Sequence, residues 1–578
     1  MFLLLFVFLV GKLSHAQDVA DSVAPEFSSG VTQKELVKAK TQMVAAANPY
    51  ASKVGHKLLN EGGGAIDAMI GVQLVLGLVE PQSSGLGGGA FLVYYDADTE
   101  KLTTFDARET APIASTPDLF LDESGNPLGF FDAVIGGRSV GTPGTVALLY
   151  DMHKRYGKLS WDTVIAPALD LAVNGFEVSP RLNASISRSA ESLFRFEKTR
   201  AYFLSEEGVP LFPGTIVKNR EYAKTLQGIA ESGKEYFYSG PLAEAIVQTV
   251  QNAPGNPGKL ALEDLAQYKV IEREPVCFQY RAYDVCGMGP PSSGALTVGQ
   301  ILGMVEAYDL KAYGPDSLES WRLIGDATRL AFADRGTYMA DSDFIKMPKG
   351  LLNASYLQSR GQLLRREDAI EPDALKPGNP PFDHAILYAP DHSLELPSTS
   401  HFSIVDRAGN VVSMTTTIEN GFGSRLMVGG FLLNNELTDF SFVPEVDGKP
   451  VANRIEPGKR PRSSMAPTIV LKDGKPVLAI GSPGGSSIIP YVAKTILAWI
   501  DWEMDIQQAI ELPHMVNKFG RYDLEKGTAA EKFSEPLEAL GFVTDIRDLN
   551  SGLHGIELTP DGLEGGADPR REGIAVGD

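Results

Sequence analysis

The sequence predicts a layered α+β fold. Apolar segments with a helical period of 3.6 residues alternate in blocks with short paired runs that are typical of β-hairpins. The 578 residues are 43% hydrophobic and 22% charged, which is an ordinary globular composition with enough apolar material for a large core. This length allows three or four small domains or one large layered unit. The composition excludes collagen-like, disordered and coiled-coil proteins.

The N-terminus is typical of an export signal. A nine-residue apolar run at 2–10 is followed by Ser14-His15-Ala16, which has the small-x-small pattern of a cleavage site. The run is too short to span a bilayer, and no other stretch reaches about 18 uninterrupted apolar residues. We therefore expect residues 1–16 to be a signal peptide and the mature protein to be exported, with an uncleaved anchor as the alternative.

Helices and strands are both predicted in the first part of the chain. Residues 64–78 are apolar on nearly all sides, which indicates a helix buried between layers. Strands at 90–95 and 102–106 follow it. Apolar periodicity then predicts helices at 145–155, 161–173, 223–231, 242–252, 296–308 and 318–334.

A proline-rich segment comes before the last third of the chain. Six prolines lie between residues 371 and 399, so this segment is predicted to be an extended linker. Two hairpins follow, with strands predicted at 401–406, 410–418, 468–471 and 476–480. A helix at 487–502 begins directly after a glycine-rich loop.

Charge, cysteine and histidine content exclude several function classes. The net charge of −21 makes nucleic acids and anionic membranes poor partners. Two cysteines are too few for a disulfide scaffold or a cysteine-based zinc site, although Cys277 and Cys286 on a predicted hairpin could form a disulfide or remain buried thiols. The eight histidines show no metal-binding spacing. We predict no metal and no cofactor.

Two glycine motifs are rejected because of their context. Residues 85–90 match a dinucleotide fingerprint, but a helix precedes them and a strand follows, which is the reverse of the required order. Residues 137–141 match a nucleophile elbow around Ser139, with 133–135 as its possible strand. An elbow starts its helix directly after the serine, whereas Pro143 delays the helix here. A structural turn is therefore the favoured interpretation of Ser139.

The strongest chemical signal is Thr399, which lies where the proline-rich linker meets a predicted hairpin. A threonine hydroxyl needs an adjacent base, and its own α-amine can serve only if the chain is cut before it. An α-amine pKa of about 7.7–8.0 suits this role near neutral pH. The loop at 481–485 offers backbone N–H groups before a helix, which suits an oxyanion. Each feature alone also fits a strand edge or a tight turn.

Taken together, these segments resemble the γ-glutamyltranspeptidases. The resemblance runs from about Met43 to the C-terminus, with the motifs in the order of the family. They are Thr399-Ser-His-Phe, Asn-Asn-Glu-Leu-Thr-Asp-Phe at 434–440, Arg-Pro-Arg-Ser-Ser-Met at 460–465, Gly-Ser-Pro-Gly-Gly at 481–485, Phe-Asp-Ala-Arg-Glu-Thr-Ala-Pro at 105–112, Gly-Thr-Pro-Gly-Thr at 141–145, Pro-Pro-Ser-Ser-Gly at 290–294 and Gly-Ala-Asp-Pro-Arg at 566–570.

The resemblance implies an N-terminal nucleophile hydrolase with four αββα layers. It implies a single precursor that cuts itself between Ser398 and Thr399. Residues 17–398 become the large chain and 399–578 the small chain, and the two remain together as a heterodimer around one shared core. The expected activity is cleavage of the γ-glutamyl bond of glutathione or related compounds, with transfer to water, an amino acid or a peptide. The family pattern favours a periplasmic or secreted enzyme.

The same resemblance assigns roles to individual residues. The implied catalytic set is a nucleophile, an assisting hydroxyl and two oxyanion-hole amides, namely Thr399, Thr417, Gly484 and Gly485. The implied donor-binding set is a cation with two hydroxyls for the α-carboxylate and acidic residues for the α-ammonium, namely Arg108, Ser463, Ser464, Glu436, Asp439 and Glu419. Many relatives carry Asn at the position of Glu419, and others carry Glu. Independently of the family, a zwitterionic head needs a fixed cation beside a fixed anion.

Three alternatives remain at this point. A cephalosporin or glutaryl acylase would share the fold, but its substrates lack the α-ammonium that Asp439 would bind. A serine hydrolase would use Ser139, and an exported solute-binding protein would need no linker–threonine junction. The segment at 443–459, where the family places a lid, is short and has no tyrosine, which indicates an open site that admits longer γ-glutamyl chains.

Overall fold

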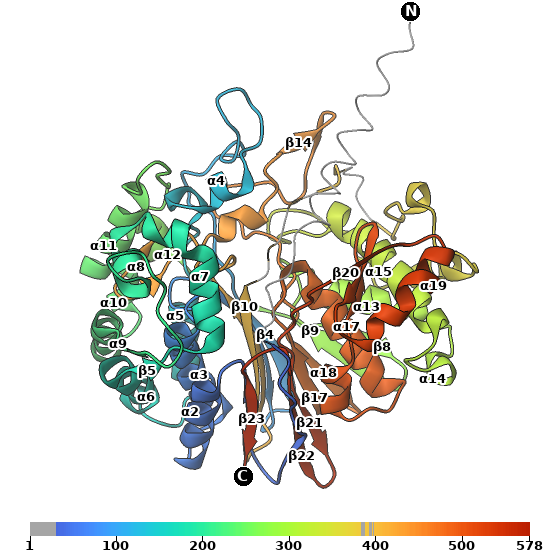
Figure 1. The fold of residues 1–578 in the computed structure, drawn as a ribbon, viewed down its shortest axis with the longest axis horizontal. Helices are drawn as coiled ribbons and strands as arrows, with labels where there is room; N and C mark the ends of the chain where they lie inside the picture. The colour runs from blue at the N-terminus through green and yellow to red at the C-terminus, as the bar shows by residue number, and fades with distance from the viewer. Residues whose placement is uncertain (1–29, 383–387, 392, 394–395, 397) are drawn as a thin grey trace, which may run out of the picture.

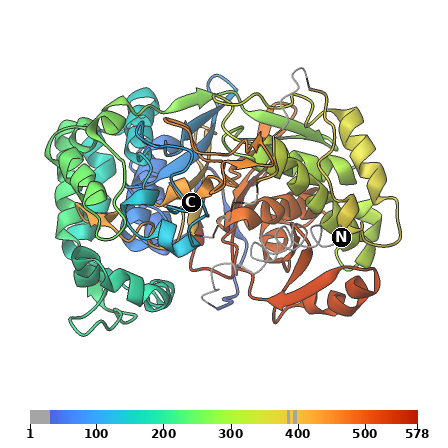
Figure 2. The same cartoon turned by 90° about the horizontal axis from the view of Figure 1, so that it is seen from above.

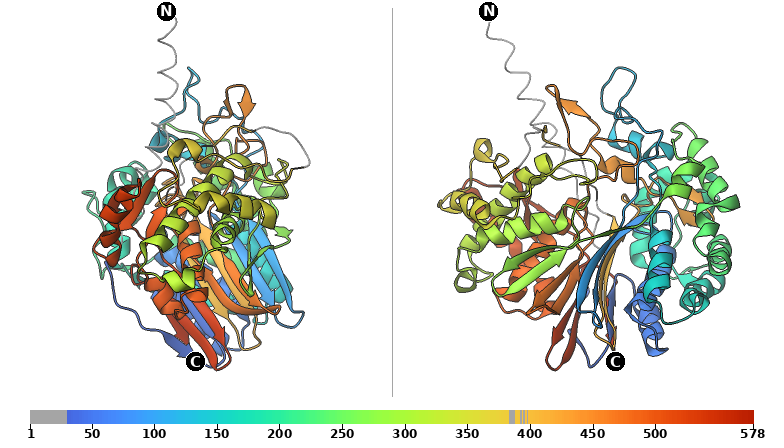
Figure 3. Two further views of the ribbon diagram at one scale, coloured as in Figure 1. Left: turned by 90° about the vertical axis from the view of Figure 1, so that its right-hand side faces the viewer. Right: turned by 180° about the vertical axis from the view of Figure 1, so that it is seen from behind.

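Two stacked β-sheets form the centre of the molecule, and helices cover the outer face of each sheet (Figures 1 and 3). The computed structural model describes residues 30–382, 388–391, 393, 396 and 398–578. The order helix, sheet, sheet, helix confirms the predicted α+β class and its four αββα layers. Within the described residues, we find no helix whose length and hydropathy would let it cross a membrane. The predicted signal peptide, residues 1–16, lies outside the described residues.

Among the described residues, each of the two sheets has seven strands, and all strand pairs within them are antiparallel. The first sheet has the order β1 (Val37–Ala39), β22 (Gly562–Ala567), β21 (His554–Thr559), β17 (Lys475–Gly481), β16 (Thr468–Lys472), β9 (Tyr283–Gly287) and β8 (Val276–Tyr280). The second has the order β23 (Ile574–Gly577), β2 (Met43–Ala46), β10 (Thr399–Val405), β11 (Val411–Thr417), β3 (Gly89–Asp96), β4 (Lys101–Ala107) and β7 (Ile271–Arg273).

The helices form two groups, one on each sheet, which Figure 2 shows from above. The second sheet is covered by α2 (Pro49–Asn60), α3 (Ala65–Val79) and α5 (Thr145–Tyr156), with α6 (Trp161–Asn174), α9 (Arg220–Ser232) and α11 (Gly240–Gln251) further out. The first sheet is covered by α13 (Gly294–Val305), α17 (Ile488–Ile500) and α18 (Ile506–Glu511), with α15 (Leu318–Tyr338) and α16 (Ala354–Gly361) packed on α13.

Smaller elements surround these layers. The other helices are α4 (Phe130–Val134), α7 (Pro180–Phe194), α8 (Glu197–Phe203), α10 (Glu235–Tyr238), α12 (Leu262–Gln267), α14 (Leu310–Tyr313) and α19 (Ser534–Ala539). The other strands are β5 (Phe176–Glu177), β6 (Ile216–Val217), β12 (Met427–Val428), β13 (Phe431–Leu432), β14 (Glu445–Val446), β15 (Lys449–Pro450), β18 (Met515–Asn517), β19 (Arg521–Glu525) and β20 (Val543–Arg547).

Apolar side chains fill the space between the layers, because the central strands have no solvent-facing side. Every residue of β10 and β11 is buried. Val93, Val405 and Ile469 belong to the cluster that joins the two sheets. Such strands appear in the sequence as nearly continuous apolar or small-residue runs, without the alternation of a half-exposed strand.

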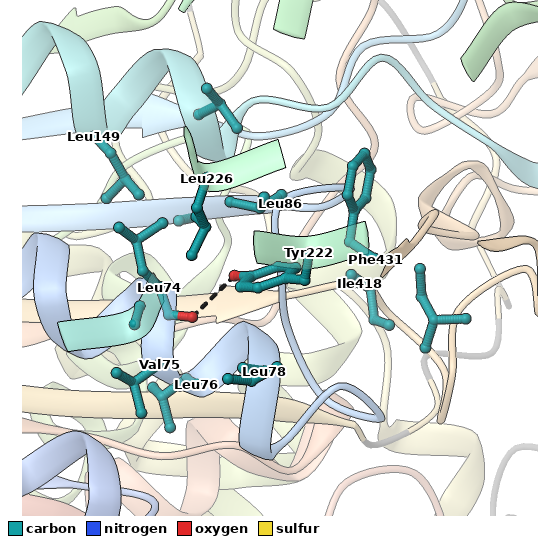
Figure 4. Close-up of a cluster of buried hydrophobic side chains, with 14 of the residues drawn as sticks. Leu74, Val75, Leu76, Leu78, Leu86, Leu149, Tyr222, Leu226, Ile418 and Phe431 are labelled. Atoms are coloured by element: carbon teal, nitrogen blue, oxygen red, sulfur yellow. Dashed lines mark hydrogen bonds between the residues drawn. The ribbon is translucent and has the colours of Figure 1, made fainter. Parts of the chain in front are cut away.

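Helix α3 is buried over its whole length, as its sequence predicts, because it lies between the second sheet and the outer helices. Figure 4 shows its side chains around Tyr222 of α9, whose hydroxyl donates a hydrogen bond to the Leu74 carbonyl oxygen at 2.9 Å. Ile418 belongs to the same cluster and directly follows β11. The packing around α3 therefore supports the end of β11, where the candidate site begins.

Three sequence interpretations can be compared with the structure. Residues 133–135, the possible strand of the Ser139 elbow, belong to the end of helix α4 and the residue after it, so no strand leads into that serine. The open question of the two cysteines has an answer: Cys277 of β8 and Cys286 of β9 lie directly opposite and form a disulfide. Within the described part of the linker, the regular structure is the short 3₁₀ turn Pro372–Ala374.

Candidate active site

Thr399 is the first residue of β10 and lies opposite Thr417, the last residue of β11. Its hydroxyl donates to Thr417 Oγ1 at 3.4 Å, and both side chains are buried. Thr417 Oγ1 accepts a hydrogen bond from the Glu419 backbone N–H at 2.8 Å and donates to the Ser398 carbonyl oxygen at 2.9 Å. The Thr417 hydroxyl therefore contacts both the threonine oxygen and the carbonyl of the peptide bond that precedes it.

Contacts with distant parts of the chain hold the residues on both sides of the Ser398–Thr399 bond. Ser398 Oγ donates to the Gln82 carbonyl oxygen at 2.7 Å. Arg571, near the C-terminus, donates to the Thr399 carbonyl oxygen at 3.2 Å. These contacts restrain the peptide bond next to the candidate nucleophile.

His401, two residues from Thr399, is engaged elsewhere. Its Nδ1 contacts Thr415 Oγ1 at 2.9 Å and its Nε2 contacts Ser403 Oγ at 3.2 Å. Complete burial lowers the pKa of its imidazole well below the usual value, and His554 adds to the shift. His401 is therefore a neutral ring that contacts strand hydroxyls.

Arg108 follows β4 and is almost completely buried. Its guanidinium donates to the carboxylates of Glu436 and Asp439, the latter at 2.5 Å, and to the Arg462 carbonyl oxygen at 2.9 Å. Burial alone lowers the pKa of the guanidinium, but the charges of Glu436 and Asp439 outweigh this and raise it above the ordinary arginine value. The site thus holds a permanent cation beside two anions.

Two further carboxyls lie in the same cluster. Burial raises the pKa of Glu419 well above its usual value, and the charge of Asp439 adds to this. Burial also raises the pKa of Glu109, with Glu436 as the next contribution. Both groups therefore favour the neutral acid. With them neutral, the acidic partners of Arg108 in this cluster are Glu436 and Asp439.

Glu419 has an unusual backbone. Its φ of 75° lies in the left-handed region, which a residue with a side chain seldom adopts. Its Oε1 accepts from the Leu396 backbone N–H at 3.3 Å, and its Oε2 accepts from the Asn435 side chain. Such strain persists only where the surroundings hold it, and it is concentrated at functional sites.

Ser463 and Ser464 are buried beside Arg108 and are fixed by the first sheet and its helices. The Ser463 carbonyl oxygen accepts from the Ser293 N–H at 2.8 Å, at the start of α13. Ser464 Oγ accepts from Arg335 of α15 at 2.7 Å. Helices that cover the first sheet therefore position hydroxyls next to an arginine from the second.

The glycine loop, residues 481–487, leads from β17 into α17. Gly484 has φ of 137° and Gly485 of 56°, and both values fall where a side chain is rarely tolerated. A Cβ on Gly484 would lie 2.9 Å from Tyr491 Cε2. The loop therefore has a shape that only glycines readily adopt.

One small pocket collects these groups. Its lining consists of Arg108, Leu396, Thr399, Thr417, Glu419, Glu436, Asp439, Ser463, Ser464, Met465, Gly485 and Ile488. It encloses about 20 Å³, which is room for a single water molecule. Leu396, three residues before Thr399, forms part of its wall.

The pocket brings together nine of the ten residues that the resemblance singles out, and Gly484 is the chain neighbour of the lining residue Gly485. Their roles are functional predictions that geometry alone does not test. Ser139 lies outside the pocket, is fully buried, and donates to the Val134 carbonyl oxygen at 2.7 Å. That contact supports a structural turn.

Sequence analysis missed Glu109, Arg335 and Arg571. Glu109 follows Arg108 in the motif at 105–112, so the sequence shows that it lies near the site. Its burial beside Glu436 cannot be predicted from the sequence. Arg335 and Arg571 reach the site only through tertiary packing. Among the described residues, we find no group of three or more His, Cys, Asp or Glu side chains arranged to hold a metal ion.

Comparison with known proteins identifies the family. Residues 51–578 match the family model described as Gamma-glutamyltranspeptidase. The chain belongs to the γ-glutamyltranspeptidase family. Among its relatives are the glutathione hydrolase proenzymes of Bacillus subtilis (strain 168), 37% identical over 94% of this chain and 92% of the relative, and of Escherichia coli (strain K12), 38% identical over 95% and 94%.

A solved structure gives the same fold. The crystal structure of cephalosporin acylase from Bacillus halodurans superposes with a TM-score of 0.82 at 26% identity, and covers 94% of this chain and 97% of its own. This protein is therefore an enzyme of the γ-glutamyltranspeptidase family with an N-terminal nucleophile hydrolase fold. That result removes the solute-binding alternative. The choice between γ-glutamyl and acylase substrates depends on the charged groups of the site.

Proposed function

We propose that this protein is a self-cleaving precursor of a γ-glutamyl hydrolase and transferase that acts on glutathione and related compounds. One observation carries the proposal. The Thr399 hydroxyl, the Arg108 guanidinium and the carboxylates of Glu436 and Asp439 line the same small pocket. A nucleophile thus lies beside a cation and two anions, which is what a zwitterionic γ-glutamyl donor requires. The glutathione hydrolase names of the relatives agree with this substrate class.

In the first step, the Thr399 hydroxyl attacks the Ser398 carbonyl carbon. The Thr417 hydroxyl, which donates to that carbonyl oxygen at 2.9 Å, stabilises the negative charge that forms there. The hydroxyl proton passes to the peptide nitrogen as the C–N bond breaks, so this nitrogen becomes the free α-amine of Thr399 and an ester links Ser398 to the threonine oxygen. Water then hydrolyses the ester, which leaves a carboxylate on Ser398 and restores the hydroxyl.

Cleavage creates both the base and the space that catalysis requires. The new α-amine accepts the hydroxyl proton near neutral pH. Leu396 is part of the pocket wall, and its N–H donates to Glu419, so withdrawal of the cut end enlarges the pocket and releases this carboxyl. Until then, the enclosed space is too small for an amino acid.

In the second step, the donor head replaces internal contacts of the site. Its α-carboxylate pairs with the Arg108 fork and the hydroxyls of Ser463 and Ser464. Its α-ammonium pairs with Glu436 and Asp439, with Glu419 beside them. The Thr399 hydroxyl attacks the γ-amide carbon, and the amides of Gly484 and Gly485 stabilise the oxyanion.

The acyl enzyme then passes its γ-glutamyl group to water or to an amine. The amide C–N bond of the donor breaks, the Thr399 α-ammonium returns its proton to the leaving amine, and a γ-glutamyl ester remains on Thr399. Attack by water releases glutamate, and attack by an amino acid or peptide amine forms a new γ-glutamyl bond. We further propose that residues 1–16 direct export, and that chains 17–398 and 399–578 stay together as a heterodimer.

Intact mass and activity of the Thr399→Ala variant test the proposal. The wild type should give two chains under denaturing conditions and release γ-glutamyl groups from glutathione. Thr399→Ala, which lacks the nucleophile, should remain one uncut chain with no measurable release. Ser139→Ala is the control and should be cut and active. An uncut but active Thr399→Ala protein would disprove the mechanism.

The acylase alternative is supported by the structural likeness to the cephalosporin acylase. A glutaryl substrate has the same chain length as a γ-glutamyl group but no α-ammonium, so Glu436 and Asp439 would face no positive charge on the substrate. Hydrolysis of matched γ-glutamyl and glutaryl anilides compares the two functions. We expect kcat/KM to favour the γ-glutamyl compound by at least about 100-fold, since two buried carboxylates would otherwise remain unpaired by substrate.

A further inference from the structure

The motif Gly-Ala-Asp-Pro-Arg at 566–570 has no role in the mechanism described above. Its Asp568 directly follows β22 and is fully buried. Burial alone would raise the pKa of Asp568, but the charge of Arg570 and hydrogen bonds from Ser551 and nearby backbone N–H groups outweigh it and lower the pKa below its ordinary value. Asp568 is therefore a buried anion whose neighbours are arranged around its charge.

The Asp568 carboxylate fixes a short segment that lies against the glycine loop. Its Oδ2 accepts from the Ser551 hydroxyl and from the Leu553 backbone N–H, the latter at 3.0 Å, and thus holds the residues on both sides of Gly552. A Cβ on Gly552 would lie 2.6 Å from Cγ of Pro483, which belongs to the glycine loop. The two segments are therefore in direct contact, and the position of the loop depends on the segment that Asp568 holds.

The same carboxylate fixes the turn that leads to Arg571. Its Oδ1 accepts from the Arg570 backbone N–H at 3.0 Å, and the Asp568 carbonyl oxygen accepts from the Arg571 backbone N–H at 3.3 Å. The Arg571 guanidinium donates to the Thr399 carbonyl oxygen at 3.2 Å. A Cβ on Gly552 would lie 2.8 Å from Arg571 Cδ, so this arginine packs on the same segment as the glycine loop.

Two stacked rings connect Asp568 to the loop by a second route. The His514 Nε2 lies 2.6 Å from Ser551 Oγ, and it is the donor because the Ser551 proton goes to Asp568. The centroids of the His514 and Tyr491 rings are 4.1 Å apart. A Cβ on Gly484 would lie 2.9 Å from Tyr491 Cε2. A chain of direct contacts therefore leads from Asp568 to Gly484.

The proposed nucleophile and the proposed oxyanion amides belong to different sheets. Thr399 begins β10 of the second sheet, whereas the glycine loop follows β17 of the first sheet. An oxyanion donor must lie within about 3 Å of the developing charge, and an error of about 1 Å can cost about 100-fold in rate. The two sheets must therefore be fixed relative to each other at this point, and the contacts of Asp568 reach both.

We propose that Asp568 is a positioning residue that sets the glycine loop against the Thr399 backbone and thereby aligns the oxyanion amides with the nucleophile. This inference rests on the proposed function. The donor head is assigned to other elements, because Arg108 follows β4, and Ser463 and Ser464 are held by α13 and α15. Loss of the Asp568 charge should therefore slow the chemical steps and leave binding of the head intact.

Asp568→Asn tests the proposal, because it removes the charge and keeps the shape of the side chain. On fully cut protein, kcat for a γ-glutamyl anilide should fall at least about tenfold, while KM changes less than about threefold. Asp406→Asn is the matched control. Asp406 is also buried and accepts from the backbone N–H groups of Ala408 and Asn410, but it lies beyond the opposite end of β10 from Thr399. This control should keep the wild-type kcat even if it loses stability.

A second measurement separates alignment from stability. A glutamate analogue with a boronic acid in place of its γ-carboxyl group forms a tetrahedral adduct with the Thr399 hydroxyl and needs the oxyanion amides, whereas glutamate itself needs only the head site. Asp568→Asn should weaken inhibition by the boronate at least about tenfold and leave inhibition by glutamate unchanged. A loss of folded protein reduces the number of sites without changing either inhibition constant.

Ser551→Ala replaces Asp568→Asn if the latter is not recovered as cut protein. It keeps the carboxylate, removes one of its contacts, and should lower kcat and boronate affinity by at least about threefold. The proposal is overturned by wild-type kcat and boronate affinity in the recovered variant, or by equal weakening of boronate and glutamate. If the wild type does not release γ-glutamyl groups from the anilide, the proposed function itself fails.

Discussion

Arg108 combines two properties that a lysine could not supply. Its planar fork contacts Glu436 and Asp439 at the same time, and its burial excludes the water that would weaken these contacts. In the proposed enzyme, the same fork holds the donor α-carboxylate. Recognition then depends on geometry as well as on charge.

Replacing Arg108 with lysine should separate geometry from charge. We expect Arg108→Lys to raise KM for a γ-glutamyl anilide at least about tenfold, because a point charge replaces a bidentate contact, with a smaller effect on kcat. Arg155→Lys, which alters an exposed arginine paired with Glu272, is the matched control and should leave KM unchanged. Steady-state kinetics on fully cut protein would measure this, and an unchanged KM in Arg108→Lys would place the head elsewhere.

The sequence predicts that a residue belongs to the candidate site where a recognisable motif contains that residue. Thr399 was inferred from its chemistry and its place after the linker, and Arg108 from its motif. Arg335 was not predictable, because it lies in the last turn of a long helix and reaches Ser464 only after α15 packs on α13. The shifted pKa of Glu109 was also hidden, since its cause is burial and a neighbour more than 300 residues away in the chain.

At the level of elements, the glycine loop fixes the start of α17. Its two positive φ values turn the chain from β17 into the helix within a few residues, and Gly485 lines the pocket. A side chain at Gly484 would meet Tyr491, so the loop would have to shift.

We therefore expect Gly484→Ala to lower kcat by about 100-fold, comparable with the loss of one oxyanion-hole donor. Gly474→Ala is the matched control, because Gly474 also has positive φ, 78°, but lies in the β16–β17 turn with open space around it. It should cost some stability and leave kcat unchanged. Single-turnover measurements would distinguish acylation from release, and a normal acylation rate in Gly484→Ala would argue against the oxyanion role.

The positions of individual helices and strands were predicted better than the pairing of the strands. Apolar periodicity located α3, α5, α6 and the β10–β11 hairpin to within a few residues. It could not show that β2 and β3 flank this hairpin, because strands buried on both faces carry no alternation that would mark a neighbour. The possible strand at 133–135 could not be decided from sequence either, because a short apolar run fits a helix as well as a strand.

On the scale of the whole molecule, the proposed cut does not divide the fold into halves. β10 and β11 of the small chain lie between β2 and β3 of the large chain, and β16, β17, β21 and β22 lie between β1 and β9. Each sheet therefore contains strands from both chains, joined by antiparallel backbone ladders.

We expect the cut chains to remain together under all native conditions. Size-exclusion chromatography and native mass spectrometry should give one species with the mass of both chains, even at nanomolar concentration, and separation should require denaturant at the concentration that unfolds the sheets. Dissociation while the far-ultraviolet circular dichroism remains native would contradict this arrangement.

The position of Thr399 in the middle of a sheet also bears on biosynthesis. Thr399 lies opposite Thr417 across the β10–β11 hairpin, and the other edge of β10 pairs with β2, so the sheet around Thr399 is complete only when a strand near residue 44 has joined one near residue 403. In the proposed enzyme, self-cleavage would follow this assembly, and the free α-amine of Thr399 would mark those molecules in which the sheet had formed.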